Sequence, residues 1–257
     1  MSNFWYKRQR LVMGVVGVVL FFFVWEALFS WVFELNPFYI SKPSLIFAAW
    51  GAVIENGQLW SDILVSGRPL AFGFGAAVVV GVAFGVVMGW RARVGYALDP
   101  FFTALYASPL VAIAPLVIIY FGVGIAGKAI LIFTLCVFPF VFNAYAGVRS
   151  VDPLLVNVVR SLGGKEKDLY LKVIVPTVLP FLVAGARYAI GRALVGVLVG
   201  EFFAASAGVG YRIAYYGDLY QLDRMFANIL TMMVFAVIFT EGIRWAERSA
   251  FPWRVGM

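Results

Sequence analysis

The stretch FGVGIAGKAI in the middle of the chain contains two overlapping patterns that bind phosphate in other proteins. Gly122, Gly124 and Gly127 follow the spacing G-x-G-x-x-G, in which glycine backbones approach a pyrophosphate closely. Gly122, Gly127 and Lys128 also follow G-x-x-x-x-G-K. Ala129 replaces the Ser or Thr whose hydroxyl would hold Mg²⁺. Whether this stretch binds a nucleotide depends on the elements around it.

The composition predicts a membrane protein. The 257 residues are 63% hydrophobic, 18% aromatic and 13% charged, far from the composition of soluble domains. The net charge of +7 does not predict nucleic-acid binding, because the basic residues lie in short stretches between apolar runs, where they set the orientation of the spans. With the single Cys136 and no His, the sequence offers neither a disulfide framework nor a zinc site of the usual spacing, and we expect no metal site.

Six apolar runs approach the length of about 20 helical residues that a bilayer requires. They are Leu11–Phe33, Leu70–Trp90, Phe101–Val123, Ala129–Val148, Thr177–Phe203 and Ile229–Trp245. We therefore expect an all-α polytopic membrane protein with about six transmembrane helices, forming one domain over residues 1–257. The first run is too long for a signal-peptide core and shows no clear cleavage site, so we expect it to be retained.

The distribution of Lys and Arg predicts the orientation. With the N-terminus inside, most of the 20 basic residues fall on the cytoplasmic side, which favours cytoplasmic positions for both termini. FGVGIAGKAI then becomes an outer turn between the third and fourth helices. A phosphate-binding loop instead follows a strand and faces cytoplasmic nucleotide. We therefore interpret the glycines as a tight turn and expect any ATP to bind another chain.

The cytoplasmic segment between the fourth and fifth runs, about residues 150–176, predicts a short helix. Asp152 followed by Pro153 is typical of a helix start, because a side-chain acceptor precedes a residue with no N–H to satisfy. Gly163 and Gly164 predict its end, and a charged return segment leads to Pro176.

This short helix is predicted to have one apolar face. Leu155, Val158, Val159 and Leu162 follow the spacing i, i+3, i+4, i+7. The face either lies at the lipid interface or docks onto a cytoplasmic partner. The pattern alone leaves both interpretations open.

The stretch RSLGGKEKDLYLKVIVPTVLPFLVAGAR resembles the loop of membrane permease subunits of binding-protein-dependent ABC importers. That loop is written as EAA, three residues, Gly, nine residues, I-x-L-P. Gly163 matches the glycine, while Val173, Val175 and Pro176 stand at the I, L and P positions. The stretches LDPFFTALYASPLVAIAPLVIIYFGVG and GEFFAASAGVGYRI extend the resemblance to the nitrate/sulfonate/taurine branch.

The resemblance implies that this loop is a coupling helix that docks onto an ATPase. The residues assigned to that contact are Leu155, Asn157, Val158, Val159, Arg160, Ser161, Leu162, Gly163, Gly164 and Lys165. The departure from the family pattern is at the EAA triplet, where Asn157, Val158 and Val159 stand. A carboxylate contact to the ATPase therefore cannot be assumed.

The resemblance also implies the partners and the activity. Two permease subunits, the second an identical copy, would form a pathway across the inner membrane, with ATPase subunits in the cytoplasm and a substrate-binding protein outside. ATP and Mg would bind the ATPase, leaving this chain with no cofactor and no enzymatic activity. The expected cargo is a small organic or inorganic anion such as a sulfonate or nitrate. The alternatives are an aromatic vitamin or thiamine precursor as cargo, and a channel.

Charged residues in the fifth run are candidates for the translocation pathway. At about 1.5 Å per residue from Pro176, Arg187 and Arg192 lie inside the membrane and Glu201 approaches its outer face. Buried charges need partners or water. For Arg187 and Glu201 a structural ion pair or a packing role is an equal alternative, whereas Arg192 is the residue expected to offset the desolvation of an anion.

A small residue recurs at every fourth position of the second run. The stripe consists of Gly73, Ala77, Gly81, Gly85 and Gly89. Small residues at this spacing let two helix backbones approach closely. We expect the stripe to pack within the subunit, with a dimer interface as the alternative.

The predicted orientation can be tested with added cysteines and an impermeant thiol reagent on intact cells. Ser2→Cys and Lys167→Cys should be shielded, because both positions are predicted to be cytoplasmic. Asn56→Cys should be labelled from outside. Labelling of Lys167→Cys in intact cells would overturn the orientation.

Overall fold

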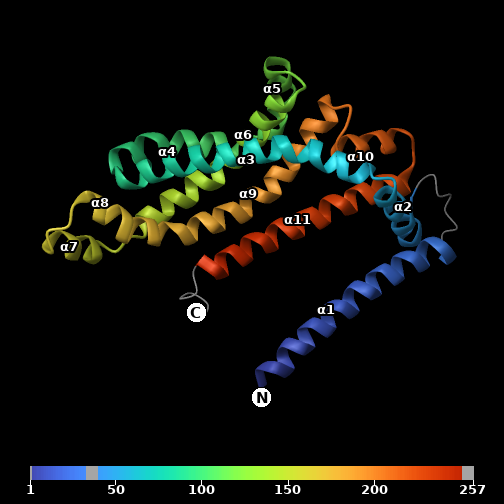
Figure 1. The fold of residues 1–257 in the computed structure, drawn as a ribbon, viewed down its shortest axis with the longest axis horizontal. Coiled ribbons are helices and arrows are strands. Elements are labelled where there is room, and N and C mark those ends of the chain that lie inside the picture. Colours follow the sequence, from blue (N-terminus) through green and yellow to red (C-terminus); the bar gives the residue numbers. More distant parts are fainter. Residues whose placement is uncertain (1, 33–39, 251–257) are drawn as a thin grey trace. The chain divides into compact units, whose positions relative to one another are not determined.

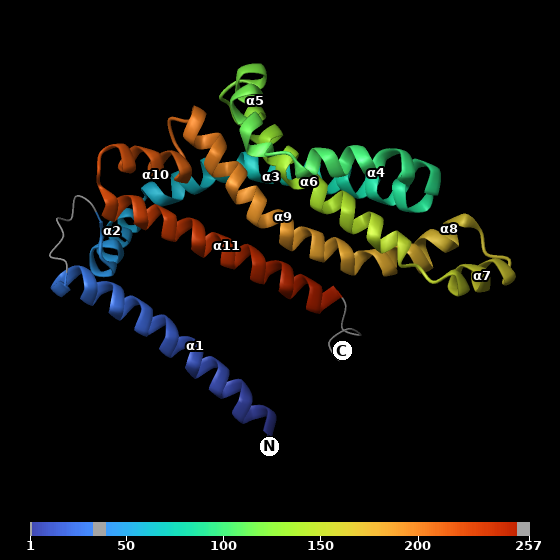
Figure 2. The same cartoon turned by 180° about the vertical axis from the view of Figure 1, so that it is seen from behind.

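The computed structural model describes residues 2–32 and 40–250, and its regular secondary structure within these ranges is helical (Figures 1 and 2). The chain divides into two compact units. One contains residues 1–61 and 212–231, and the other contains residues 62–211 and 232–257. The prediction of a single domain over residues 1–257 stays a prediction.

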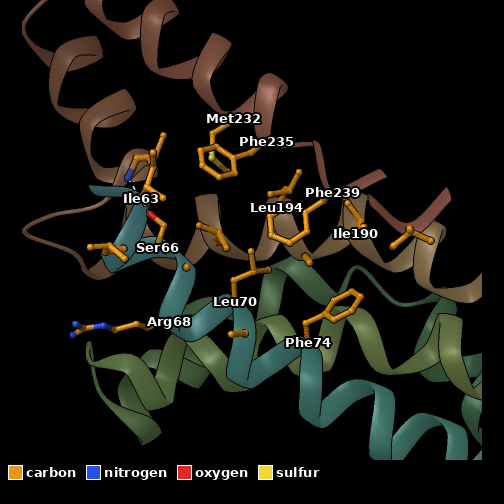
Figure 3. Close-up of a pocket in the computed structure, with 17 residues that line it drawn as sticks. Ile63, Ser66, Arg68, Leu70, Phe74, Ile190, Leu194, Met232, Phe235 and Phe239 are labelled. Carbon is orange, nitrogen blue, oxygen red and sulfur yellow. Dashed lines mark hydrogen bonds between the residues drawn. The ribbon is translucent and has the colours of Figure 1, made fainter. Parts of the chain in front are cut away.

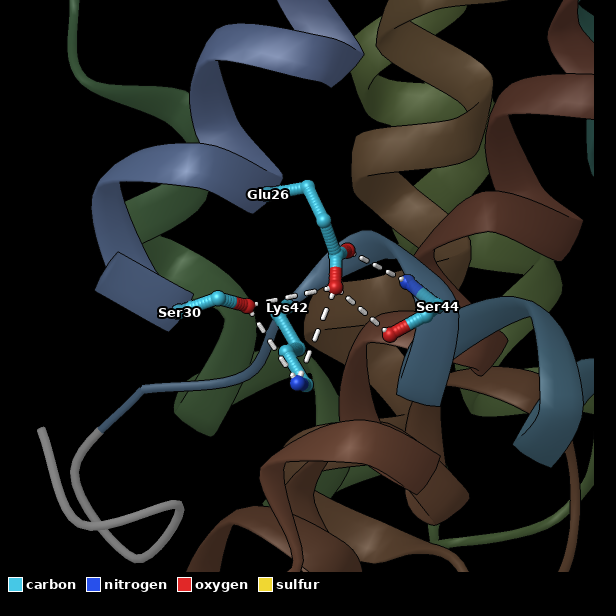
Figure 4. A network of polar contacts seen from close by, with 4 residues as sticks. All are labelled: Glu26, Ser30, Lys42 and Ser44. Carbon is cyan, nitrogen blue, oxygen red and sulfur yellow. Dashed lines mark hydrogen bonds and ion pairs between the residues drawn. The ribbon is translucent and has the colours of Figure 1, made fainter. Parts of the chain in front are cut away.

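The first unit is held together by a polar contact between two helices. α1 (Ser2–Ala27) continues into a π-helical turn, and α2 (Pro43–Glu55) follows. The Glu26 carboxylate accepts hydrogen bonds from the Ser44 backbone N–H at 2.9 Å and from its hydroxyl at 2.8 Å (Figure 4). The Lys42 ammonium lies 3.7 Å from the same carboxylate. Glu26 thus satisfies a free amide at the start of α2.

The second unit contains most of the membrane-spanning helices. The helices of this unit are α3 (Gln58–Trp90, which begins in the first unit), α4 (Ala92–Ala107), α5 (Ala114–Phe121), α6 (Ile125–Arg149), α7 (Pro153–Ser161), α8 (Glu166–Leu169) and α9 (Val175–Ala204). Of these, α7 and α8 are too short to span a membrane. α10 (Val209–Asp218) and α11 (Leu222–Ala250) each have residues in both units. Among the described residues, five helices are long and apolar enough to span a membrane, or six when a bent pair counts as one span.

The bent pair corrects the predicted third helix, Phe101–Val123, which is not continuous. α4 ends at Ala107, and the chain bends by 80° before it continues toward α5. Pro109 explains the break, because proline disfavours helical conformation in the residue before it. Ser108 is accordingly extended, with φ −71° and ψ 152°. Its hydroxyl donates hydrogen bonds of 3.0 and 2.8 Å to carbonyls in the last turn of α4.

The small-residue stripe of α3 packs within the chain against α6, as expected. A methyl group built on Gly81 would lie 2.7 Å from the Val137 carbonyl oxygen, and one on Gly85 would lie 2.6 Å from the Ala144 Cβ atom. Such distances are shorter than van der Waals contact. The two backbones can therefore approach this closely only because these positions lack a side chain.

α9 packs against the same helix α6 through glycines of its own. A methyl group on Gly185 would lie 3.1 Å from the Pro139 carbonyl, and one on Gly196 would lie 3.0 Å from the Ile132 side chain. Ala189, which is fully buried between them, has its carbonyl 3.4 Å from the Cys136 sulfur. α6 therefore holds α3 on one side and α9 on another, which explains why so much of it is buried.

The α3–α6 contact predicts a sharp difference between two glycine substitutions on one helix. Gly85→Ala should destabilise the protein by about 1–3 kcal/mol, as overpacking of a tight core does. Gly75→Ala is the matched control, because a methyl group there meets nothing within 4 Å. Thermal unfolding of the purified protein in detergent measures both. Equal stability of the two variants would contradict the packing described.

Candidate functional site

α7 begins as the sequence predicts. The Asp152 side chain accepts a hydrogen bond of 2.8 Å from the Leu154 N–H, and Pro153 is the first residue of the helix. The cap satisfies one of the amides that have no partner at a helix start. In Figures 1 and 2, α7 and α8 lie beyond one end of the α6–α9 pair. A short helix thus projects from the membrane-spanning bundle.

The two glycines after α7 end it for different physical reasons. Gly163 has a φ of +73°, a conformation that costs other residues about 1 kcal/mol or more. A methyl group on Gly164 would lie 2.6 Å from the Val159 side chain and 2.8 Å from the Val159 carbonyl oxygen. Gly163 therefore allows the reversal of the chain, and Gly164 allows it to fold back onto α7.

One side of α7 packs against a buried apolar cluster at the base of the helix bundle. We call it the basal cluster; its residues are Val148, Leu169, Val173, Ile174 and Val178. Val156 and Val159 of α7 are partly buried against it, as is Tyr170. The cluster joins the end of α6, the start of α9 and the loop between them. α7 is therefore fixed to the bundle.

The adjacent side of α7 is apolar and exposed. Leu154 is 65% exposed, Leu155 49%, Val158 46% and Leu162 82%. The predicted apolar face is thus corrected at Val159, which turns toward the basal cluster, and Leu154 takes a place in the exposed patch. These four residues form what we call the docking patch. Several large apolar side chains grouped outside the spanning helices favour a partner surface.

The rest of the predicted coupling segment is polar and exposed. The Arg160 guanidinium lies 3.8 Å from the Glu166 carboxylate, with both side chains more than half exposed. Lys165 precedes α8, and its backbone N–H donates a 3.0 Å hydrogen bond to Asp168. Asn157 and Ser161 are exposed on α7. All the predicted coupling residues thus lie on one short helix and the turn that follows it.

The three charged residues predicted in the fifth run have different surroundings. Arg187 pairs with Glu247 of α11. Glu201 is buried, and its carboxylate accepts hydrogen bonds of 2.8 Å from the Ser66 hydroxyl and from the Gly210 N–H. Arg192 lies over the Tyr106 ring, with 4.5 Å between its guanidinium carbon and the ring centroid. These three side chains therefore do not form one cluster, and their role in the pathway stays a prediction.

The Glu201 network includes residues that the sequence did not single out for this role. The Lys128 ammonium, expected in an outer turn, is buried and lies 3.9 Å from the Glu201 carboxylate. The buried Asp62 side chain accepts a 2.9 Å hydrogen bond from the Gly208 N–H in the loop after α9. Ser66 and Glu201 are 135 positions apart. No local pattern reveals a contact over that separation.

The glycines of FGVGIAGKAI form a turn, as expected. Gly122 ends α5 with a φ of +81°, and Gly124 precedes α6. A methyl group on Gly127 would collide with the Gly122 carbonyl oxygen. Lys128 points into the Glu201 network, where it cannot reach a phosphate at the turn. The glycine spacing is therefore explained by helix packing.

A cavity of about 520 Å³ lies between α3, α9 and α11 (Figure 3). Its lining is apolar, with Leu70, Phe74, Leu194 and Phe235 among the larger side chains. The Ser66 hydroxyl at its edge is already used, since it donates to Glu201 and accepts from the Val209 N–H. The Arg68 side chain points away from the cavity in Figure 3. Arg68 is the one charged residue in the described lining of the cavity, and in this structure its guanidinium does not point into it (Figure 3).

Comparison with known proteins identifies the family. A family model described as "Binding-protein-dependent transport system inner membrane component" matches residues 77–250. A protein of Brucella abortus, named a probable ABC transporter permease protein, is 32% identical over 202 residues, which cover 79% of this chain and 81% of that protein. The taurine transport system permease protein TauC of Escherichia coli is 27% identical over 252 residues, covering 96% and 90%.

The fold agrees with this match. An inward-facing structure of the MetNI methionine ABC transporter contains a chain similar to this one, with a TM-score of 0.62 and 15% identity. The similarity covers 74% of this chain and 96% of that chain. Several spanning helices, a multi-pass architecture and the family match agree. The chain belongs to the family of inner membrane components of binding-protein-dependent transport systems, and is an ABC importer permease.

Proposed function

We propose that α7 is the element through which a separate ATPase drives this permease. The observation that supports the proposal is the docking patch of Leu154, Leu155, Val158 and Leu162, which is exposed on a helix outside the spanning segments. Exposed apolar side chains in water favour a protein partner. The exposed Arg160 and Asn157 flank the patch and suit the polar rim of such an interface.

The ATPase binds ATP and Mg, and this chain supplies no catalytic group. A substrate-binding protein delivers cargo to the outer side, and a second permease, an identical copy, completes the pathway. The family description, which names dependence on a binding protein, supports the outer partner. The identical copy rests on the resemblance of the loop to permeases that work in pairs.

Movement of α7 is passed to the membrane by rigid contact. Val156 and Val159 hold α7 against the basal cluster, and α8 runs through a π-helical turn, Tyr170–Ile174, directly into α9. Closure of two ATPases would bring the two α7 helices together and tilt α9 with them. Such rigid-body motion switches a pathway between inward-facing and outward-facing states.

The proposed cargo is a small anion, such as a sulfonate or nitrate. The similarity to TauC, a taurine transport permease, supports this class, because taurine carries a sulfonate group. Thiamine precursors are the alternative class. Growth on individual sulfonates as the sole sulfur source, with and without the gene, separates the two.

A charge placed in the docking patch tests the proposal. Val158→Asp should lower co-purification of the cognate ATPase at least tenfold, because a carboxylate would have to be buried unpaired in the interface. Lys167→Asp is the matched control, since it places the same side chain on an exposed position of α8, outside the patch.

Both variants should insert normally and purify in equal amounts, because neither position is buried. Wild-type co-purification of Val158→Asp would refute docking through this patch. An equal loss of ATPase co-purification in both variants would show that any negative charge in the loop weakens ATPase binding, and would contradict docking through the patch.

A further inference from the structure

Arg192 is a cation inside the membrane-spanning bundle that has no carboxylate partner among residues 2–32 and 40–250. It lies 17 residues after the start of α9 and 12 before its end, so about 26 and 18 Å from the two ends of the helix. Its guanidinium carbon lies over the face of the Tyr106 ring, 4.5 Å from the ring centroid. A guanidinium at this depth requires an anion, water or an aromatic face.

Arg187 lies about one and a half turns earlier on the same helix. It is an example of a charge on a spanning helix that the fold neutralises with a partner of its own. Arg187 has the carboxylate of Glu247 as its partner. The Lys128 ammonium likewise lies 3.9 Å from Glu201. Arg192 has a ring in place of a carboxylate, and a cation–π contact compensates a buried charge only in part. The guanidinium of Arg192 can therefore still bind an anion.

The ring that Arg192 contacts stands beside a break in a membrane span. Tyr106 is the second-last residue of α4, and the chain bends by 80° just beyond it. Its ring packs against Phe138 and Phe142 of α6, with centroid separations of 5.9 and 5.4 Å. Irregular backbone within a membrane protein occurs where it lines a cavity or lies buried in protein, and broken helices form the central sites of many transporters.

The side of α9 next to Arg192 is open. Tyr188 is 70% exposed and Val195 is 43% exposed, and a methyl group on Gly191 would meet nothing within 4 Å. The opposite side of α9, with Gly185 and Ala189, packs against α6. Arg192 itself is partly exposed.

We infer that Arg192, held over Tyr106 at the α4–α5 break, is a binding site for a small monovalent oxyanion inside the membrane. The inference rests on the proposed function and assigns a place on the pathway to the anionic cargo. The planar guanidinium donates paired hydrogen bonds to a sulfonate, nitrate or carboxylate. The Tyr106 ring holds the guanidinium in position and competes only weakly, so the anion can also leave.

The site also selects against one class of solute. The Tyr106 ring could stack with a cationic aromatic solute such as thiamine. The positive charge of Arg192 on that ring would repel such a solute. The inference therefore distinguishes anions from a cationic vitamin such as thiamine by electrostatics. It does not depend on the substrate-binding protein.

The test uses the full-length permease in lipid nanodiscs, with sodium ethanesulfonate and sodium nitrate as probes at constant ionic strength in sodium chloride. Ethanesulfonate should raise the unfolding midpoint in a concentration-dependent way, because a ligand of the native state stabilises it. Arg192→Gln should weaken the apparent affinity roughly tenfold or more, the loss expected for a charge-assisted hydrogen bond. Thiamine should give no shift.

Arg93→Gln is the matched control, because it removes an exposed arginine from the start of the α4 helix that carries Tyr106. It should bind ethanesulfonate as the wild type does. If Arg192→Gln does not fold, Arg192→Lys serves in its place and should bind several-fold more weakly, since an ammonium cannot donate in parallel to two oxygens.

The inference is overturned if neither anion stabilises the wild type, or if the Arg192 variant that folds responds as strongly as the wild type. Co-purification of the cognate ATPase is measured on the same samples. Wild-type permease that binds the ATPase but no anion would refute this site and leave the proposed function intact. Failure to bind the ATPase would refute the proposed function itself.

Discussion

The close approach of α9 to α6 is the contact on which the rest of the second unit depends. Bilayer lipid is as apolar as the helix surfaces, so helices in a membrane are held by tight packing and by polar contacts. Gly185 and Gly196 let the two backbones meet, and α3 approaches α6 from another side through Gly81 and Gly85. At one end, the buried Glu201 network joins all three helices by polar contacts.

This packing supports the proposal that a short helix outside the spanning segments acts on the helices of the bundle. The basal cluster, which is built from α6, α8, the turn Tyr170–Ile174 and α9, also receives Val156 and Val159 of α7. One side of α7 is thereby fixed, while the docking patch on its other side stays exposed. In the proposed mechanism, a push on the patch would reach α9 through the contacts of Val156 and Val159 with the basal cluster. Arg192 lies on that same α9.

Local chemistry in the sequence predicted α7 well, since the cap at Asp152 and the turn at Gly163 are set by neighbouring residues. The spacing of small residues likewise predicted the packing of α3. The periodicity failed at Val159, because the width of a helix face that is buried depends on its tertiary neighbours. The sequence did not predict the break at Ser108, because an apolar run looks the same whether or not the helix bends within it. It did not predict the partners of Glu201, because contacts between distant positions leave no local pattern.

The distance between α7 and α9 within one subunit tests the rigid coupling most directly. Spin labels on Ser161→Cys, which is exposed on α7 outside the docking patch, and on Tyr188→Cys can be placed on one permease copy of the assembled complex. The distance between them should be the same without nucleotide and with ATP, while the distance between Ser161 labels on the two copies shortens. If the distance within one subunit changes when ATP binds, α7 swings independently of α9, and the basal cluster does not transmit the motion.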